Sequence, residues 1–405
     1  MTTDISTLLS ASERYQLELT AFLRDLVRIP SVNGRDPEGP VALRIEEEAR
    51  KLGLESRLVA REPERPNVLV TYGSGADRFA LIAHMDTVAE GDPATWSSPP
   101  FAAEIKEGRL IGRGSADNKA GIACSLYALA LLRDLKLIDP AHEQAILVGV
   151  VDEESGACSP LGVRYLLDSG ALQARGAIYA YTSDIVCIGH RGLLRLEVNA
   201  RGQAIHAGVA EWHHHVRGAN AVLALSDLLL RLESLKLPAE APPGFEHLGV
   251  TFTPGTIFHG GNFPSIVPDF ASAVVDIRLL PGQSSADVLE KVQEQIRAVE
   301  DERPRIAFEL RETADIPGAS IPQDHPLALT AQDYTEALTG KRWETAGAGP
   351  ANEGYMLIEA GIPTLCGFGP TGGNPHAPDE WVETNSLPVT VAMFAGIIRD
   401  YLNLR

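Results

Sequence analysis

The sequence AILVGVVDEESG, residues 145–156, runs through seven apolar or small residues and then directly into three consecutive acids. A short apolar run that ends in turn-forming residues is typical of a strand buried on both faces. In open α/β sheets, functional side chains gather at the carboxyl ends of such strands. The stretch therefore predicts a layered fold, and it makes the acid trio a candidate for chemistry.

Similar segments surround this strand. Apolar runs at 79–83 and 177–182 predict two more buried strands, and a helix is expected over 119–135. Ser10 and Glu13 have the spacing of a capping box that would start a further amphipathic helix. This alternation is typical of an α/β domain with a largely parallel, mixed sheet flanked by helices.

The pattern changes from residue 194 onward. Apolar and polar residues alternate first, and helical and strand patterns then follow each other more loosely. The expected elements are a strand containing Leu194, Leu196 and Val198, a helix at 218–235, a strand at 272–280 and a helix at 284–299. We therefore predict an inserted, smaller α+β lid or dimerisation domain over 194–308, and a metal-binding catalytic domain formed by 1–193 and 309–405.

Composition narrows the class of function. The 405 residues include 54 acids and 35 bases, which gives a formal net charge of -19. Such a charge repels phosphate backbones and anionic lipid surfaces, so neither nucleic acid nor a membrane is expected as a partner. There is no membrane-spanning apolar run and no secretory-signal pattern, so we expect a cytoplasmic protein. The four cysteines lack metal-site spacing and are expected to be core thiols.

Four predicted strand ends or loops carry residues of the types that bind metals. These are His84 with Asp86, Asp117, the trio Asp152-Glu153-Glu154, and His376. A mixture of imidazole and carboxylate suits zinc, cobalt or manganese, whereas calcium prefers oxygen ligands alone. The four places are far apart in the sequence, but the predicted fold brings them together at one metal site.

Seven motifs along the chain resemble, in order, those of the M20 metallopeptidases and deacylases. This family includes acetylornithine deacetylase, succinyl-diaminopimelate desuccinylase, aminoacylases and glutamate carboxypeptidase. The motifs are FLRDLVRIPSVNG, ALIAHMDTV, FAAEIKEGRLIGRGSADNKAG, VVDEESG, GHRGLLRLEVNARGQAIHAG, VVDIRLLPG and GIPTLCGFGPTGGNPHAPDEWV. The resemblance implies a catalytic domain that holds two metal ions, and an inserted lid domain that often mediates dimerisation.

The resemblance also assigns ligand roles. His84 would bind one ion, Asp117 would bridge both, and Glu154 and His376 would complete the second. Asp86 would stand behind His84 and fix the tautomer of its ring, as outer carboxylates do at metal sites. Two divalent ions are implied, with zinc the first choice and cobalt or manganese the alternatives.

The implied reaction is hydrolysis of an amide-type C–N bond by a metal-bound hydroxide, with Glu153 as the general base. The substrate would be a small molecule with a free carboxylate, such as an N-acyl amino acid or a dipeptide. In relatives, the positions of Arg278 and His206 hold the substrate carboxylate and stabilise the oxyanion. The alternative is structural, with Arg278 an exposed strand residue and His206 a turn residue. Asp152 has no assigned role.

The sequence departs from the family pattern at one candidate ligand. Relatives carry an EPT-like motif whose acid completes the first metal, and Ala180 occupies that position here. Asp184 is the carboxylate within reach downstream, so we predict that it replaces the missing ligand. The alternative is a turn acid, with Thr182, Tyr181 or water at the metal. Glu353 also stands where relatives have an aspartate.

Two alternative functions remain open at this point. The same metal centre could perform aminohydrolase or carbamoyl-hydrolase chemistry, because the nucleophile could attack a different carbon. The chain could instead be a non-catalytic metal-binding or assembly module, although the presence of Glu153 argues against lost activity.

We expect a homodimer formed through the inserted domain, with the alternating strand at 194–198 as a pairing edge.

Overall fold

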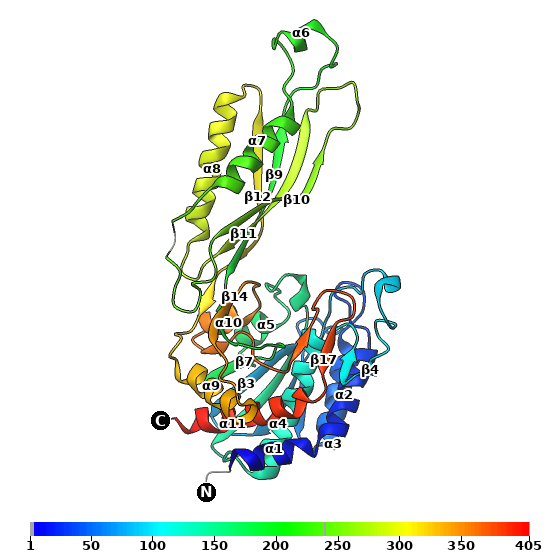
Figure 1. Cartoon of the computed structure of the whole chain (residues 1–405), viewed down its shortest axis with the longest axis vertical. Helices are drawn as coiled ribbons and strands as arrows, with labels where there is room; N and C mark the ends of the chain where they lie inside the picture. Colours follow the sequence, from blue (N-terminus) through cyan, green and yellow to red (C-terminus); the bar gives the residue numbers. More distant parts are fainter. Residues whose placement is uncertain (1–3, 239, 405) are drawn as a thin grey trace. The chain divides into compact units, whose positions relative to one another are not determined.

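The computed structural model describes residues 4–238 and 240–404, and its contacts divide the chain into two compact units (Figure 1). The first contains the described residues up to His190, then Ser320–Ala348 and the chain from Asn352 onward. The second contains Arg191–Ala319 and Gly349–Ala351. The boundaries predicted at 194 and 308 both fall inside strands, and the observed units keep those strands whole.

A six-stranded mixed sheet forms the centre of the first unit, in the order β1-β2-β6-β3-β7-β15. Four neighbouring strands are parallel, and β2 and β1 add an antiparallel edge. The strands are β1 (Glu55–Val59), β2 (Asn67–Gly73), β3 (Asp77–His84), β6 (Glu143–Val150), β7 (Gly176–Tyr179) and β15 (Thr364–Leu365). The three strands predicted from apolar runs correspond to β3, β6 and β7.

Helices flank this sheet. They are α1 (Ile5–Glu13), α2 (Gln16–Arg28), α3 (Gly39–Lys51), α4 (Ala120–Leu135), α5 (Val163–Asp168), α9 (Pro326–Thr339), α10 (Gly354–Glu359) and α11 (Ser386–Asn403). Every residue of α4 from Ala120 to Leu132 is buried, because α4 packs between the sheet and α11. The predicted capping box is wrong: Ser10 lies inside α1, and a separate helix begins at Gln16.

Two small sheets and three short helical turns complete the first unit and its junctions. One sheet has the order β13-β8-β14 and the other β16-β17-β5-β4. Their strands are β4 (Glu104–Lys106), β5 (Arg109–Ile111), β8 (Val186–His190), β13 (Ala319–Ser320), β14 (Thr345–Ala348), β16 (Gly372–Gly373) and β17 (Trp381–Glu383). The turns are η1 (Pro93–Thr95), η2 (Ser115–Lys119) and η3 (Glu153–Ser155).

The second unit is an antiparallel sheet of order β10-β11-β9-β12 with helices packed against it. Its elements are β9 (Gly192–Arg201), α6 (Ala210–His213), α7 (Ala221–Ser234), β10 (Thr251–Gly260), β11 (Phe270–Leu279), α8 (Ser285–Glu302) and β12 (Ala307–Ile316). Leu194, Leu196 and Val198 of β9 lie in the core formed with α7 and α8. The predicted fold class, a mixed α/β unit with an inserted α+β unit, is confirmed.

One detail of that prediction is wrong. The strand containing residues 194–198 was expected to present an edge, but β9 pairs with β11 on one side and β12 on the other. The strands with an unpaired side are β10 and β12. The alternation in β9 therefore reflects one face packed on helices, which is equally typical of a central antiparallel strand.

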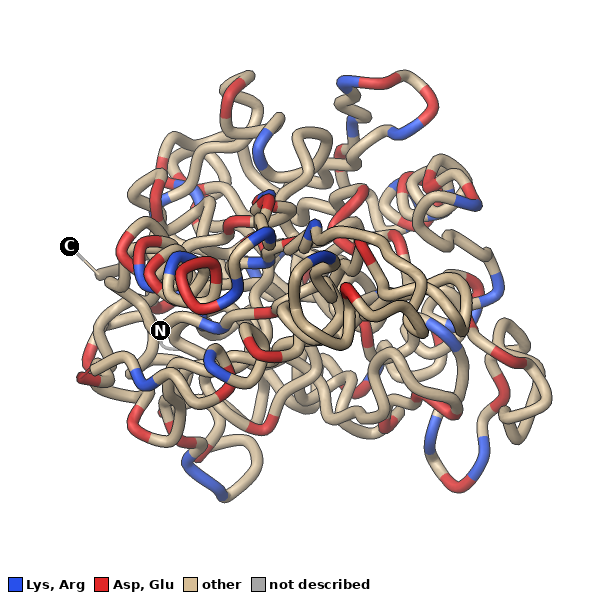
Figure 2. The backbone as a smooth tube through the Cα atoms, turned by 90° about the horizontal axis from the view of Figure 1, so that it is seen from above, with Lys and Arg blue, Asp and Glu red and all other residues tan. Residues whose placement is uncertain are grey.

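The described residues contain no helix that is both long and apolar enough to cross a bilayer. Figure 2 shows Lys and Arg interleaved with Asp and Glu along the chain rather than gathered in one basic stripe. Cys124, Cys187 and Cys366 are buried as core thiols, as predicted, whereas Cys158 is exposed.

Candidate metal centre

The carboxyl ends of β3 and β6 lie side by side. In the parallel register His84, the last residue of β3, is opposite Val150, the last residue of β6. Beyond β6 the chain turns sharply at Asp152, whose φ of 66° is in the left-handed region. Glu153 and Glu154 then begin η3. The turn therefore places the two glutamates at the same edge of the sheet as His84.

Four of the predicted ligands converge at this edge. His84 Nε2 lies 2.8 Å from Asp117 Oδ1, and His376 Nε2 lies 3.3 Å from Asp117 Oδ2. His376 Nε2 is also 3.2 Å from Glu154 Oε1. The two oxygens of Asp117 thus face two different imidazoles, which is the arrangement expected of a carboxylate shared between two cations.

The donor set fits divalent metal ions. One potential ligand atom from each of His84, Asp117 and Glu154 lies within 4.8 Å of the others. Glu154 Oε1 is buried, and its contact with His376 Nε2 at 3.2 Å lacks hydrogen-bond geometry. A buried carboxylate oxygen without a donor is costly, and a cation would satisfy it. Imidazole and carboxylate together are the ligands that zinc and similar ions use.

Asp86 connects the histidine to the acid turn. His84 Nδ1 lies 2.9 Å from the backbone oxygen of Asp86 and 3.5 Å from its Oδ1. The Asp86 carboxylate accepts the backbone N–H groups of Glu153, at 3.3 Å, and of Glu154, at 3.0 Å. It also accepts Asn33 Nδ2 at 2.7 Å. Asp86 is therefore placed to orient the His84 ring and to hold the turn that carries both glutamates.

Asp152, to which the sequence assigns no role, stabilises this turn through contacts of its own side chain. Its Oδ1 lies 2.9 Å from both Asn33 Nδ2 and Arg65 Nη1, and its Oδ2 accepts the Ser159 hydroxyl at 2.5 Å. Arg65 is itself held by the buried carboxylate of Glu38. The first acid of the trio is therefore structural, because all its contacts are with side chains around the turn.

Glu153 is the most deeply buried acid of the trio. It is 6% exposed, and burial raises the pKa of its carboxyl group to about 8. Its Oε1 accepts the hydroxyl of Tyr181 at 3.1 Å. A buried carboxylate with one defined donor, adjacent to the candidate ligands, has the environment of a general base.

A pair of tyrosines links Glu153 to a second buried acid. The rings of Tyr179 and Tyr181 stack with centroids 5.0 Å apart, and Tyr179 donates its hydroxyl to Glu353 Oε2 at 3.2 Å. Glu353 is fully buried, and burial raises its pKa well above the usual range. The sequence singled out Glu353 only as a departure from the family and Tyr181 only as an alternative ligand, because nothing local indicates this pairing.

The remaining predicted site residues lie elsewhere. Asp184 is exposed between β7 and β8, and among the described residues it makes no ion pair with the cluster. His206 and Arg278 belong to the second unit. His206 is exposed and accepts the Gly208 N–H, while Arg278 donates to Asp276 at 2.7 Å and 3.3 Å. The structure thus groups the central ligands and leaves Asp184 outside the group.

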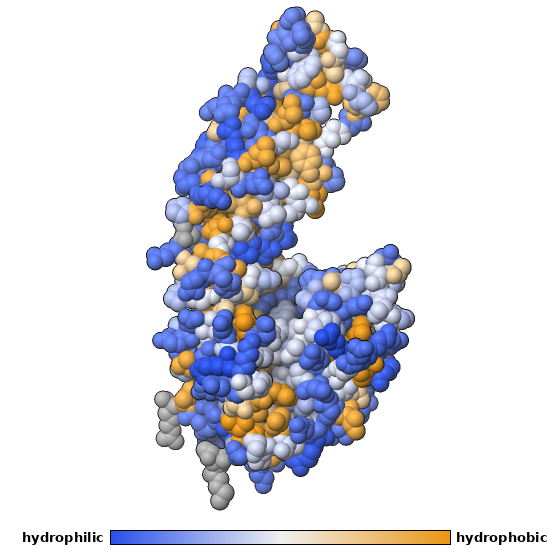
Figure 3. Space-filling view, in the orientation of Figure 1, coloured by the Kyte–Doolittle hydropathy of each residue, from blue (hydrophilic) through white to orange (hydrophobic). Residues whose placement is uncertain are grey.

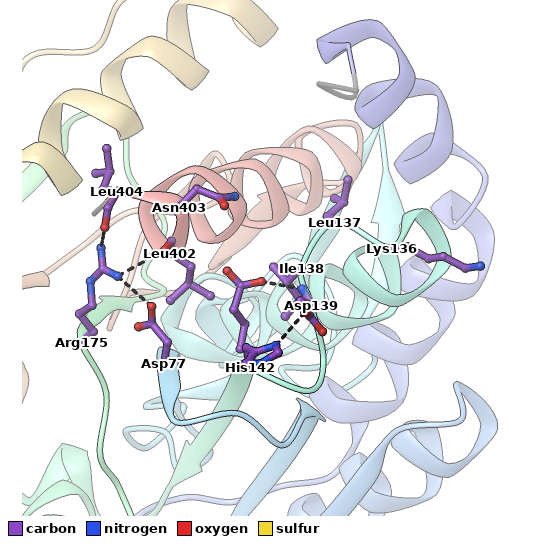
Figure 4. A pocket seen from close by; sticks show the side chains of 11 residues that line it. Asp77, Lys136, Leu137, Ile138, Asp139, His142, Arg175, Leu402, Asn403 and Leu404 are labelled. Atoms are coloured by element: carbon purple, nitrogen blue, oxygen red, sulfur yellow. Dashed lines mark hydrogen bonds and ion pairs between the residues drawn. The ribbon is translucent and has the colours of Figure 1, made fainter.

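A pocket of about 590 Å³ lies at the opposite edge of the sheet, where β3 and β6 begin (Figure 4). It contains acids and a histidine, but these are paired: Asp77 with Arg175 at 2.8 Å, and Asp139 with His142 at 2.8 Å. Arg175 also donates to backbone oxygens near the end of α11. Asp77 and Asp139 therefore each have a partner within this pocket.

Comparisons with known proteins agree with this geometry. Residues 80–400 match the model of peptidase family M20/M25/M40. Succinyl-diaminopimelate desuccinylase of Cereibacter sphaeroides is 30% identical, over 95% of this chain and 99% of that protein.

Two solved structures are similar to this chain at low sequence identity, which establishes the fold. The M20 family metallo-carboxypeptidase Sso-CP2 of Sulfolobus solfataricus is 18% identical with a TM-score of 0.76, over 96% of this chain and 100% of that one. YXEP of Bacillus subtilis, described as a dinuclear metal-binding peptidase, is 16% identical with a TM-score of 0.71, over 97% and 100%. The match to the family model and the 30% identical relative show that this chain belongs to peptidase family M20/M25/M40, whose members are metal-dependent hydrolases acting on amide bonds.

Proposed function

We propose that the chain binds two divalent metal ions at His84, Asp117, Glu154 and His376, and hydrolyses an amide-type C–N bond in a small substrate that carries a carboxylate. The observation that carries this proposal is the position of Asp117, whose two carboxylate oxygens face His84 and His376 separately. Zinc is the first choice of metal, with cobalt or manganese as alternatives, because the ligands combine imidazole and carboxylate.

When bound, two such ions would lower the pKa of the attacking water and polarise the scissile carbonyl. Glu153 takes a proton from the attacking water and delivers it to the leaving nitrogen, which is the work of a general acid–base group. Tyr181 holds Glu153 Oε1 through its hydroxyl, and Asp86 fixes the backbone of Glu153. These contacts limit the motion of the carboxylate between the two proton transfers.

The substrate carboxylate is assigned to Arg278 and the oxyanion to His206, both in the second unit. Asp276 supports the assignment for Arg278, because its two oxygens accept Arg278 Nε and one terminal nitrogen and so fix the plane of the guanidinium. A fixed guanidinium can bind carboxylate through two parallel hydrogen bonds, which lysine cannot reproduce. Arg278→Lys should reduce kcat/KM for an acid substrate far more than for its amide analogue, and equal losses would make Arg278 structural.

The third ligand of the first ion remains a separate proposal. Asp184 is the predicted replacement for the acid missing at Ala180, although it lies in an exposed loop outside the cluster. If Asp184 moves to the metal, Asp184→Ala should retain about one ion per chain, since Glu154 and His376 still hold the other. Two tightly bound ions in that variant would make Asp184 a bystander.

The substrate class is tested by a panel of N-acyl amino acids, dipeptides and carbamoyl compounds. The metal-free protein receives zinc, cobalt or manganese, and release of the amine is measured. N-acyl amino acids or dipeptides are expected to be cleaved. Turnover of carbamoyl compounds alone would favour the carbamoyl-hydrolase alternative, and metal binding without any turnover would favour a non-catalytic module.

We also infer a homodimer formed through the second unit. β10 has one unpaired side and exposes Ile257 and Phe258, which are 54% and 41% exposed, and α7 exposes Leu223 and Leu230. Figure 3 shows apolar residues gathered over these elements. An exposed edge strand with apolar side chains favours pairing with another copy. Sedimentation should find a dimer that Ile257→Lys weakens, whereas a monomer at micromolar concentration would contradict it.

A further inference from the structure

Two of the candidate ligand loops leave the same antiparallel ladder. β5 leads into the loop that carries Asp117, and β17 follows the loop that carries His376. Ile111 pairs with Trp381, and one residue further the Gly112 N–H donates to the backbone oxygen of Glu380 at 2.9 Å. Glu380 therefore stands where the two ligand loops separate.

The side chain of Glu380 is the acceptor at this junction. It is fully buried, and each of its oxygens accepts two hydrogen bonds. Oε2 accepts Arg113 Nη1 at 2.5 Å and the Gly114 N–H at 3.0 Å. Oε1 accepts the N–H groups of Ala116 and Asp117, both at 2.8 Å. Three backbone N–H groups of the ligand loop, those of Gly114, Ala116 and Asp117, thus point at one carboxylate.

These donors depend on Glu380 because the loop is irregular. Asp117 and Asn118 have non-helical backbone angles, so η2 does not continue regularly into α4. Buried N–H groups that lose their acceptor carry a desolvation penalty, and the loop would have to rearrange to avoid it. Burial raises the pKa of Glu380, while Arg113 and the backbone donors favour its ionised form.

We propose that Glu380 is the positioning residue for the metal centre: it fixes the main chain of Asp117, the shared ligand, and couples the Asp117 loop to the His376 loop. Glu380 contacts neither imidazole of the cluster and acts through the backbone. The expected effect on metal affinity rests on the proposed two-metal function. Because Asp117 faces both His84 and His376, displacing its backbone should weaken the binding of both ions, whereas loss of Glu154 should weaken the binding of one.

The first test measures metal affinity. Zinc is titrated into metal-free wild type, Glu380→Gln and a matched control, Glu48→Gln, and binding is followed calorimetrically. Glu48 is 7% exposed and paired with Arg44, so its variant also disrupts a buried acid, but away from the cluster. Glu380→Gln should bind both ions about 10- to 100-fold more weakly, the usual cost of losing an outer partner at a metal site. Glu48→Gln should bind like wild type.

The second test needs no metal. Amide hydrogen exchange in the metal-free protein should be faster in Glu380→Gln at Gly114, Ala116 and Asp117, while the centre of α4 exchanges as in wild type. If Glu380→Gln does not fold, Glu380→Asp replaces it in both tests. This variant keeps the negative charge, but its shorter side chain moves the carboxylate away from the three backbone N–H groups. Unchanged exchange at the three amides, or wild-type affinity for both ions, would overturn the positioning role. Absence of zinc binding in wild type, with faster exchange in the variant, would overturn the proposed function alone.

Discussion

The two edges of the central sheet in the first unit carry the same types of side chain with opposite consequences. At the amino edge, Asp139 and His142 pair with each other and are 59% and 81% exposed. At the carboxyl edge, His84 and Asp86 are fully buried, and Glu154 Oε1 is buried with no well-aligned hydrogen bond among the described residues. Histidine and carboxylate therefore do not make a site by themselves. The difference lies in burial and in an excess of acids over bases.

This contrast has a physical origin in the parallel strands. Their carboxyl ends meet at one edge, so the loops that follow β3, β6 and β7 crowd together. Outer residues hold these loops in place: Asn33 donates its side-chain amide to the Asp86 carboxylate, and Asp86 accepts the backbone N–H of Glu154. At the amino edge, each acid has its own partner and solvent covers the rest. The comparison predicts large effects at one edge and almost none at the other.

Glu153→Ala should give the largest effect that leaves the metal in place. Turnover should fall by about 10²- to 10⁴-fold, the usual contribution of general acid–base catalysis, while metal content stays near wild type. Glu154→Ala should lose metal instead, because its Oε1 lies among the ligands. Glu143→Ala, at the amino end of the same strand β6, is the control and should retain both. Elemental analysis measures the metal content of each variant, and steady-state kinetics measures its kcat. Equal metal loss in Glu153→Ala and Glu154→Ala would contradict the division of roles.

Tyr181→Phe should lower kcat by about 10- to 150-fold, because a hydrogen bond to a charged group contributes roughly 1.5 to 3 kcal/mol. Metal content should not change. The matched control is Tyr179→Phe, which removes the hydroxyl of the stacked neighbour that donates to Glu353 instead. Steady-state kinetics of both variants shows whether the hydroxyl that contacts Glu153 matters more than the one that contacts Glu353. Unchanged kcat in Tyr181→Phe, which keeps the ring, would show that Tyr181 only fills space.

Glu353→Gln should increase the free energy of unfolding of the metal-free protein relative to wild type, and this gain should grow as pH rises. Burial raises the folded-state pKa of Glu353 well above its usual range, so above about pH 4.5 the unfolded chain releases a proton that the folded protein retains. The free energy of unfolding of wild type therefore decreases from this group as pH rises, and a neutral glutamine avoids that loss. The melting temperature of Glu353→Gln should exceed that of wild type by more at pH 8 than at pH 5. An advantage of wild type at pH 8 would show that Glu353 is ionised when folded.

Asp139→Asn and His142→Ala should have the smallest effects. Both side chains are exposed and pair across the surface, and isolated surface pairs contribute little to stability. Turnover and metal content should equal those of wild type. A loss of activity in either variant would mean that the amino edge takes part in function, and the comparison of the two edges would fail.

The sequence predicted those parts of the fold that depend on local patterns. The apolar runs at 79–83, 145–151 and 177–182 became β3, β6 and β7, because strands buried on both faces need continuous apolar residues. The second unit's helices and central strands were also placed near their observed bounds. The local pattern does not predict the antiparallel β2, and it wrongly predicts an edge position for β9, because pairing partners depend on contacts between distant segments.

The same distinction applies to the site. His84, Asp117, Glu154 and His376 could be predicted because motifs carry them in order, and the structure brings them together. The roles of the outer residues could not be predicted. Asn33 and Glu380 lie in quoted motifs, but their contacts, like those of Arg65, depend on the folded chain. Asp152 shows the limit clearly: its neighbours in sequence suggested chemistry, but its partners in space make it structural.

Anomalous X-ray scattering from crystals grown with zinc tests the central claim most directly. The two-metal account predicts two peaks about 3.5 to 4 Å apart, with Asp117 between them, His84 beside one, and Glu154 and His376 beside the other. Glu154→Ala should lose the second peak. A single peak in wild type, or peaks beside Asp139 and His142 at the opposite edge, would contradict the account.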